Sequence, residues 1–496
     1  MNKQISRIAV FTLLLLASLI VATTYWQTWA APGLAAKQDN AIQRVAQFTI
    51  DRGLIYASDG RTVLAANRAA KIGGRTLYFR KYPAKELAAH VVGYSTQARS
   101  RSGLERSENA YLTAANASLG TIWSKVGAQL TGKTIKGNNL VLNLRTDAQQ
   151  VAISALRGKC GAAFVMNPRT GQVYVSASSP SFDPNRIEAG NGYAAILHSP
   201  SACPGSSGPL LNRATSGLFP PGSTFKTVTA AAALESGVYS AQSRFNDRGY
   251  CVEYGQPVSN ALNPDQTAER YGDVSFLEAY EHSINAVFCD IGKALGAKRV
   301  LDQAKRFGFY AKPPLEIPSG EVAASGLYHL SSGLYDNPSI VDPGRLAFGQ
   351  EHLLATPLQM TLVAAAVANG GVIMQPHLVN RITSPSGATV VAVRPRPWRR
   401  AVSPKTAAVL SSFLQAVVTG GTGAAAALPG IRVAGKTGTA ETNQKGVYTA
   451  WFIFFAPADR PQVAGAVVVE HQLHGFGGAV AAPIARQLIR VLLSRH

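Results

Sequence analysis

One short group of polar residues in the middle of the chain could supply a nucleophile and its base. Residues 223–226 read Ser-Thr-Phe-Lys and follow Pro-Pro-Gly at 220–222. If Ser223 opens a helix, its hydroxyl lies at the positive end of the helix dipole, and Lys226 projects from the same face one turn later. A desolvated lysine with a lowered pKa can take the hydroxyl proton. On its own the pattern is weak, because a capping serine followed by a solvated lysine has the same spacing.

Two groups further along the chain could supply the remaining chemistry of a covalent enzyme. Ser283 and Asn285 offer a hydroxyl for proton relay and a carboxamide to hold a substrate. On a strand beside a cleft, Lys436 would supply positive charge, Thr437 a hydroxyl for a substrate carboxylate, and Gly438 room for a guest backbone. Each group alone is as readily a surface turn. None of the three groups indicates a function by itself.

The elements that must position these groups follow from the pattern of apolar residues. Apolar runs at 162–166 and 173–175 flank a turn-rich connection, which is typical of a hairpin. Strands at both ends of the large domain bracket many helices, so the sequence predicts an α+β fold with an antiparallel sheet flanked by helices. Further strands are expected at 140–142, 448–455 and 462–470, and helices at 146–156, 224–237, 274–295, 297–307, 357–369, 404–419 and from Pro483.

The first residues of the chain predict a membrane anchor. Residues 8–29 carry no charge, and at about 1.5 Å per residue a helix of this length crosses the hydrocarbon core of a bilayer. Lys3 and Arg7 precede the span, so we expect a cytoplasmic tail at 1–7 and the rest of the chain outside the cytoplasm. A cleaved signal peptide is the alternative, since residues 28–30 form a weak cleavage site. Both interpretations give an extracytoplasmic protein.

Beyond the span, turn signals divide the chain into a small and a large domain. Short apolar runs alternate with turns such as Ser58-Asp59-Gly60 and Gly73-Gly74, which predicts a small β-rich domain at 30–150. The large domain follows at 151–496. The three polar groups all belong to the large domain.

Charge and cysteine content narrow the class of protein. The chain has 48 Lys and Arg against 27 Asp and Glu, and its net charge of +21 favours contact with an anionic surface. No zinc-finger, RNA-recognition or helix-turn-helix pattern organises the basic residues, so nucleic acid is not an expected partner. The four cysteines suit disulfides in an oxidising compartment, with Cys251–Cys289 as one candidate pair and free thiols as the alternative.

In their order, Ser-x-x-Lys, Ser-x-Asn and Lys-Thr-Gly form the signature of penicillin-binding proteins and serine β-lactamases. The flanks of 223–226, the segments 348–350 and 356–359, and residues 434–440 resemble class B penicillin-binding proteins, as does Arg-Gly-Leu-Ile-Tyr at 52–56. The second motif has Ile284 where Asp is common, which argues against a β-lactamase. The resemblance covers nearly all of the chain after the anchor and is strongest to the group called penicillin-binding protein A.

This resemblance implies a penicillin-binding, serine β-lactamase-like transpeptidase domain at 151–496 with a dimerisation or pedestal-like domain at 30–150. The implied activity is peptidoglycan D,D-transpeptidation, in which stem peptides ending in D-Ala-D-Ala are cross-linked through acyl-Ser223 and β-lactams inhibit covalently. No metal or organic cofactor is implied, and other wall-synthesis or division proteins are open as partners. The implied catalytic residues are Ser223, Lys226, Ser283, Asn285 and Lys436, and the implied substrate-binding residues are Thr437, Gly438 and Thr439.

Other functions fit parts of the sequence. A D,D-carboxypeptidase would pass the acyl group to water, and a penicillin sensor or division scaffold would use the same fold without cross-linking. Residues 127–134 match the P-loop pattern, but the turn-like segment after them does not continue as a helix, and ATP is absent outside the cytoplasm. Pro221 and Phe225 occupy the positions where a Gly-x-Ser-x-Gly hydrolase elbow needs glycines.

Overall fold

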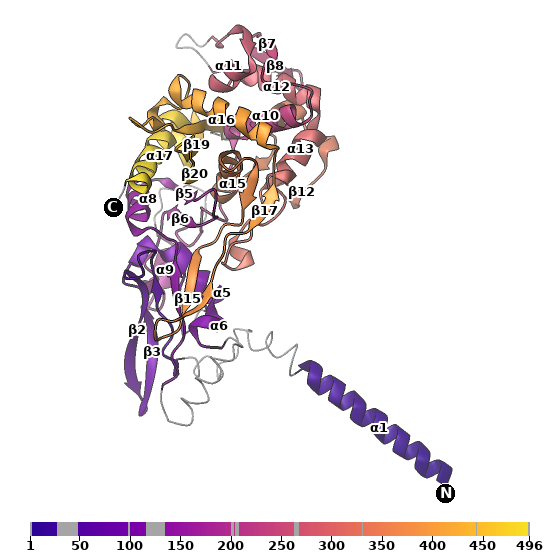
Figure 1. Ribbon diagram of the computed structural model, residues 1–496, viewed down its shortest axis with the longest axis vertical. Coiled ribbons are helices and arrows are strands. Elements are labelled where there is room, and N and C mark those ends of the chain that lie inside the picture. Colours follow the sequence, from indigo (N-terminus) through magenta and orange to yellow (C-terminus); the bar gives the residue numbers. More distant parts are fainter. Residues whose placement is uncertain are drawn as a thin grey trace.

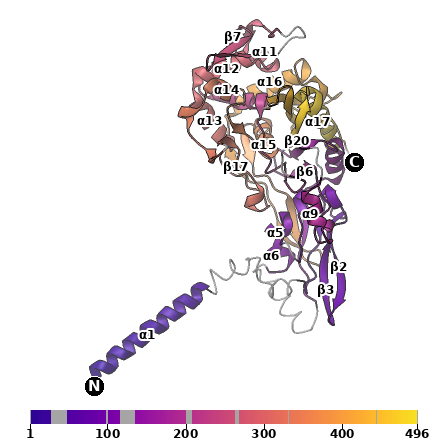
Figure 2. The same cartoon turned by 180° about the vertical axis from the view of Figure 1, so that it is seen from behind.

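The structure is a computed structural model, shown in Figure 1 and from behind in Figure 2. It describes residues 2–26, 48–97, 100–115, 134–199, 203, 208–261, 267–329, 331–442 and 444–494. The P-loop-like segment therefore lies outside the described residues except for Thr134. Helix α1 (Asn2–Thr24) is apolar and is long enough to cross a membrane. It begins before the expected span at 8–29, whose last residues, 27–29, are not described.

A five-stranded antiparallel sheet in the order β18-β19-β20-β5-β6 forms the centre of the large domain. Its inner strands are buried on both faces, because alternate side chains enter two different apolar clusters. Phe164 and Val468 pack toward α15, and Val165 and Val467 pack toward α17 and α8. The elements are β5 (Cys160–Met166), β6 (Val173–Ser179), β18 (Ala434–Glu441), β19 (Val447–Ala456), β20 (Val463–Leu473), α8 (Thr146–Ala155), α15 (Pro357–Ala368) and α17 (Gly477–Leu493).

A helical layer lies beyond α15, at the end of the molecule opposite the hairpin of β2 (Val63–Ile72) and β3 (Arg75–Lys81) (Figure 1). Polar N-caps start three of its helices, because the side chains of Ser275, Asp342 and Ser403 accept bonds from backbone N–H groups of the first turn. Its helices are α10 (Lys226–Glu235), α11 (Phe276–Glu281), α12 (Asn285–Leu295), α13 (Ala297–Arg306), α14 (Pro343–Ala347) and α16 (Pro404–Thr419). Short strands accompany them: β7 (Arg244–Asp247), β8 (Tyr250–Glu253), β9 (Gln256–Ser259), β10 (Gly272–Ser275), β11 (Gly326–His329), β12 (Gly333–Tyr335), β13 (Leu353–Leu354), β14 (Val372–Met374) and β17 (Pro397–Arg400).

The N-terminal strands belong to a second, six-stranded sheet in the order β16-β15-β4-β1-β2-β3. Two of its strands, β15 (Val379–Thr383) and β16 (Thr389–Ala392), come from the C-terminal part of the chain, and β15 pairs directly with β4 (Asn139–Leu142). The others are β1 (Ile55–Tyr56), β2 (Val63–Ile72) and β3 (Arg75–Lys81), with the short helices α4 (Ala89–Val92), α5 (Gly103–Ser107) and α6 (Asn109–Leu112) beside them. Residues far apart in the sequence thus complete one sheet.

A buried ion cluster holds the N-terminal strands to α5. The Glu105 carboxylate, fully buried, lies 2.7 Å from Arg52 Nε and 2.6 Å from Arg80 Nε. Arg80 also donates to Asn67 on β2, so the cluster connects the hairpin to the helix. Burial alone would raise the pKa of Glu105, but the two arginines lower it on balance. Arg52, the first residue of the segment 52–56 that resembles class B penicillin-binding proteins, therefore stabilises the N-terminal fold through Glu105.

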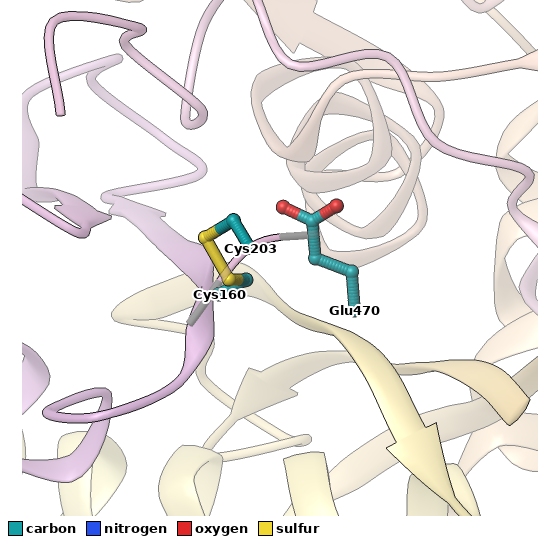
Figure 3. Close-up of side chains that lie close together, drawn as sticks. All are labelled: Cys160, Cys203 and Glu470. Atoms are coloured by element: carbon teal, nitrogen blue, oxygen red, sulfur yellow. A yellow bond between two sulfur atoms is a disulfide. The ribbon is translucent and has the colours of Figure 1, made fainter. Parts of the chain in front are cut away.

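All four cysteines are paired, as Cys160–Cys203 and Cys251–Cys289. The second pair confirms the pairing considered from the sequence and joins β8 to α12. Figure 3 shows the first disulfide at the start of β5, with the Glu470 carboxylate of β20 beside it. That carboxylate accepts a hydrogen bond from the buried Arg213 guanidinium at 2.9 Å.

Two helices differ from the expectation. The stretch 274–295 is not one helix, because the chain reverses at 282–284 between α11 and α12. Helix α17 begins at Gly477 rather than near Pro483, which lies inside the helix. A Cβ at Gly477 would come within 2.3 Å of the Trp451 carbonyl, so only glycine permits this close approach to the sheet.

We expect Glu105→Ala to destabilise the fold by about 3–5 kcal/mol, because it leaves two buried arginines without a counter-charge. Calorimetry should show the lowest-temperature transition shifting down, while Glu86→Ala, an exposed position, leaves it unchanged. Since the folded-state pKa of Glu105 is lowered from 4.5, its ionic contribution is fully present above that value and is lost as the pH falls through the folded-state pKa. An unaltered transition in the Glu105 variant would contradict this role.

Candidate active site

Ser223 lies on a tight turn that leads into α10. Residues Gly222–Phe225 form a 3-10 turn, and the α-helix begins only at Lys226, so Ser223 does not open the helix as the sequence suggested. Gly222 has a φ of 52°, a left-handed conformation that glycine adopts without strain. Its neighbours are buried, whereas Ser223 is half-buried. The serine is therefore held rigidly and is still accessible.

Lys226 points into the protein from the first turn of α10 and is fully buried. Its Nζ donates to the Ser283 carbonyl at 2.6 Å, to Asn285 Oδ1 at 2.7 Å and to Ser283 Oγ at 3.3 Å. Burial lowers the pKa of Lys226 well below its usual range, and the positive charge of Lys436 lowers it further. A lysine in this setting can be neutral and accept a proton.

Lys436 also donates to the Ser283 hydroxyl, from a different element. Its Nζ lies 2.8 Å from Ser283 Oγ, and the side chain, on β18, is fully buried. Burial lowers the pKa of Lys436 to about 7. The Ser283 hydroxyl thus lies between two desolvated lysines, which is the arrangement needed to pass a proton from one amine to another.

The Ser283–Asn285 segment is fixed by its backbone and by a neighbouring loop. Ser283 has a φ of 58°, an uncommon conformation for a residue with a side chain, and this reversal separates α11 from α12. Asn285 Nδ2 donates to the Ser259 carbonyl at 3.0 Å, and the N–H of Ala286 donates to Asn260 Oδ1 at 2.9 Å. Ile284 is buried in the core, which explains an apolar residue between two polar ones.

Strand β18 presents the third motif beside Ser223. The Thr437 and Thr422 hydroxyls lie 2.6 Å apart, and Thr439 Oγ1 accepts from the N–H of Gly477 at 3.3 Å. A Cβ at Gly438 would lie 2.8 Å from the Pro221 carbonyl, so glycine lets β18 approach the turn that carries Ser223. The structure thereby brings all eight residues named from the sequence onto adjoining elements: η4 (Gly222–Phe225), α10, the α11–α12 turn and β18.

Several supporting residues were not found by sequence reasoning. Thr422 lies before β18 and contacts Thr437, Asn260 holds the N-terminus of α12, and the indole of Trp451 donates to the Pro220 carbonyl at 2.9 Å. Lys226 and Lys436 also lie 5.3 Å and 5.7 Å from the ring centres of Phe288 and Tyr280. None of these residues belongs to a short motif, so only tertiary structure reveals them.

A cavity of about 400 Å³ lies elsewhere, at the turns joining β5 to β6 and β19 to β20. Asn167, Arg169, Thr170, Arg460, Pro461 and Gln462 line it. No motif residue borders this cavity, so the candidate site is defined by Lys226 and Lys436, their hydrogen bonds to Ser283, and the adjoining turn that carries Ser223.

Two family descriptions match the chain. Residues 161–490 match the penicillin binding protein transpeptidase domain, and residues 52–140 match the penicillin binding protein A dimerisation domain. The chain belongs to the penicillin-binding protein transpeptidase family. The resemblance expected from the three motifs is confirmed, and the family match includes all of them.

Similar proteins extend over the full chain. The peptidoglycan D,D-transpeptidase PbpA of Mycolicibacterium smegmatis is 34% identical over 99% of both chains, and that of Mycobacterium tuberculosis is 32% identical with the same coverage. A solved structure of penicillin-binding protein A from M. tuberculosis, a ceftriaxone acyl-enzyme complex, has a TM-score of 0.79 at 30% identity and covers 91% of this chain and 100% of that one. The D,D-transpeptidase domain of a peptidoglycan glycosyltransferase from Eggerthella lenta has a TM-score of 0.73 at 33% identity, covering 90% and 99% of the two chains. This penicillin-binding protein therefore shares both its sequence and its fold with transpeptidases.

We expect Lys436→Met to move the pH dependence of acylation upward. In the native site the charge of Lys436 lowers the pKa of Lys226, so its removal raises that pKa, and a higher pH is then needed to obtain the neutral amine. Stopped-flow acylation by a chromogenic β-lactam from pH 5 to 10 should show the rising limb displaced and the rate near neutrality about 100-fold lower. Lys445→Met, at an exposed position, is the matched control. A limb that stays in place would show that the two lysines are not coupled.

Proposed function

We propose that this protein is a peptidoglycan D,D-transpeptidase that cross-links stem peptides through an acyl-enzyme on Ser223. The observation that carries the proposal is the Lys226–Ser283–Lys436 arrangement beside an accessible serine. Full-length similarity to proteins named peptidoglycan D,D-transpeptidase supports the reaction and the substrate. The similar M. tuberculosis structure, described as an acyl-enzyme complex, supports covalent β-lactam binding.

In the first half-reaction, neutral Lys226 accepts the proton of Ser223 Oγ as that oxygen attacks the carbonyl carbon of the penultimate D-Ala. The peptide bond to the terminal D-Ala then breaks, and the leaving amine takes a proton through the Ser283 hydroxyl. Lys226 and Lys436 both contact this hydroxyl, so a proton can pass along it without entering bulk water. Asn285 is the residue proposed to hold the substrate amide.

The transition state of this attack places negative charge on the former carbonyl oxygen. The N–H groups of Ser223 and Thr439 are the proposed donors to it. A Cβ built at Gly222 would lie 2.8 Å from the Thr439 carbonyl, which shows how closely the two backbones approach. Preorganised donors of this kind contribute about 3–4 kcal/mol each. Lys436, Thr437 and Gly438 would hold the substrate carboxylate and backbone along β18.

In the second half-reaction, the amine of another stem peptide attacks the acyl carbon and Ser223 leaves as a hydroxyl. Water in place of this amine would give D,D-carboxypeptidation. Each step exchanges one acyl bond for another and moves protons between amines and hydroxyls. The groups present in the site are those that such an exchange needs.

We place the catalytic body outside the cytoplasm, attached by α1 as a single-pass anchor. The length and composition of α1 support an anchor, and two basic residues, Lys3 and Arg7, support a cytoplasmic N-terminus. Residues 30–150 form the proposed dimerisation or pedestal-like domain, and 151–496 the proposed transpeptidase domain. Other wall-synthesis or division proteins are proposed to bind the former, which carries none of the catalytic motifs.

The nucleophile can be tested by fluorescent-penicillin labelling of the full chain with intact-mass measurement. We expect a single adduct on the wild type, none on Ser223→Ala, and at least about 100-fold slower labelling of Lys226→Ala, because the base is gone. Ser386→Ala and Lys405→Ala, at exposed positions, should label like the wild type. An adduct on Ser223→Ala would exclude Ser223 as the nucleophile.

The acceptor can be tested with a stem-peptide donor ending in D-Ala-D-Ala. We expect D-Ala release and a cross-linked dimer when a second stem peptide with a free side-chain amine is present, as measured by mass spectrometry. Release of D-Ala with only the hydrolysed tetrapeptide, at all acceptor concentrations, would instead indicate a carboxypeptidase.

A further inference from the structure

The outer half of the β2–β3 hairpin extends beyond the sheet to which it belongs. Strand β1 pairs with β2 only at Val63 and Ala65, whereas β2 and β3 pair with each other as far as Ile72 and Arg75. Figures 1 and 2 both show this hairpin projecting at one end of the molecule, opposite the helical layer. Much of the surface of the projecting part is exposed and takes no part in the proposed catalysis.

One face of the projecting hairpin combines basic and apolar side chains. In this antiparallel pair, directly opposed residues share a face, and the register gives the pairs Arg68/Phe79, Ala70/Leu77, Ile72/Arg75 and Ala66/Lys81. We call these eight residues the hairpin face. Arg68, Arg75 and Lys81 are exposed, and Ile72 is 55% exposed at the end of its strand. No Asp or Glu occurs between residues 63 and 81.

The residue that follows the segment after the membrane helix contacts this hairpin. Residues 27–47 lead from α1 to Phe48, and the carbonyl of Phe48 accepts a hydrogen bond from the N–H of Tyr78 on β3 at 2.7 Å. The ring of Phe48 also packs against Phe79 of the hairpin face, with centroids 5.6 Å apart. The first described residue after α1 and the segment 27–47 therefore lies against the hairpin.

We propose that the hairpin face docks on the anionic lipid surface of the membrane that α1 enters, and so sets the orientation of the catalytic body. Basic residues beside exposed apolar ones are the composition of surfaces that lie in a membrane interface. A soluble polyanion would match the charge but would give Ile72 and Leu77 no hydrocarbon to contact. The proposal rests on α1 being a membrane anchor.

The full chain can be tested in lipid nanodiscs made of phosphatidylcholine alone or mixed with phosphatidylglycerol. A dye on Thr76→Cys reports the hairpin end, because the native cysteines are all in disulfides. We expect headgroup-quencher lipids to quench the dye several-fold more in the anionic discs, and Arg68→Glu with Arg75→Glu to lower the docked-to-undocked ratio about thirtyfold. Arg157→Glu with Arg169→Glu, an equal charge change at exposed positions on the large domain, should have little effect.

Equal quenching in the two lipids, or an equal loss in the control pair, would overturn the proposal. So would protection of the hairpin end by a soluble anionic wall polymer with no quenching by lipid. A chain that fails to enter nanodiscs would overturn the proposal that α1 is an anchor. A chain that inserts, but whose dye is quenched equally in neutral and anionic discs, would overturn only the docking of the hairpin face. Retained penicillin labelling in each variant establishes that the catalytic body is folded.

Discussion

Two lysine ammonium groups buried on either side of one serine hydroxyl are the constraint on which the rest of the structure depends. Neither Lys226 nor Lys436 has exposed surface, and within the described residues their Nζ atoms donate to hydroxyl, carbonyl and amide oxygens of Ser283, Asn285 and Thr437. Removing a lysine from water disfavours its charged form, so burial costs stability and lowers the pKa of both amines, that of Lys436 to about 7. A loosely packed site would admit water and restore both pKa values.

Much of the surrounding structure holds three segments in place around the Ser283 hydroxyl: the turn before α10, the turn between α11 and α12, and β18. The turn before α10, the middle of β18 and the start of α17 approach one another more closely than residues with a Cβ permit, and the reversal between α11 and α12 joins them through the lysine hydrogen bonds. Gly222, Gly438 and Gly477 stand where a Cβ would meet a backbone carbonyl, and Ser283 accepts a left-handed conformation. Because each segment belongs to a different part of the sequence, the site exists only in the complete fold.

The sequence predicted the residues that carry the chemistry better than it predicted the elements and hydrogen-bond partners that hold them in place. Ser223, Lys226, Ser283, Asn285 and the residues at 436–439 are recognisable because their types and order are distinctive, and long apolar runs such as 448–455 indicated the sheet. The division of 274–295 into two helices could not be predicted, because the turn between them is held by tertiary hydrogen bonds to Ser259 and Asn260. The starting point of α17 was also missed, since contact with Trp451 and Thr439, rather than a local signal, determines it. Half-buried hydrogen-bond partners such as Asn67 have no signal in a single sequence.

The pairing of β15 with β4 limits how the chain could be divided into independent parts. A strand from the C-terminal region closes the N-terminal sheet, and apolar side chains such as Val379 and Ile382 are buried there. Cutting the chain at one point would leave an unpaired edge on both fragments, and such edges recruit other strands and aggregate. The N-terminal sheet is therefore complete only when the C-terminal region of the same chain supplies β15 and β16, and the N-terminal part is not a unit that can be removed or replaced by itself.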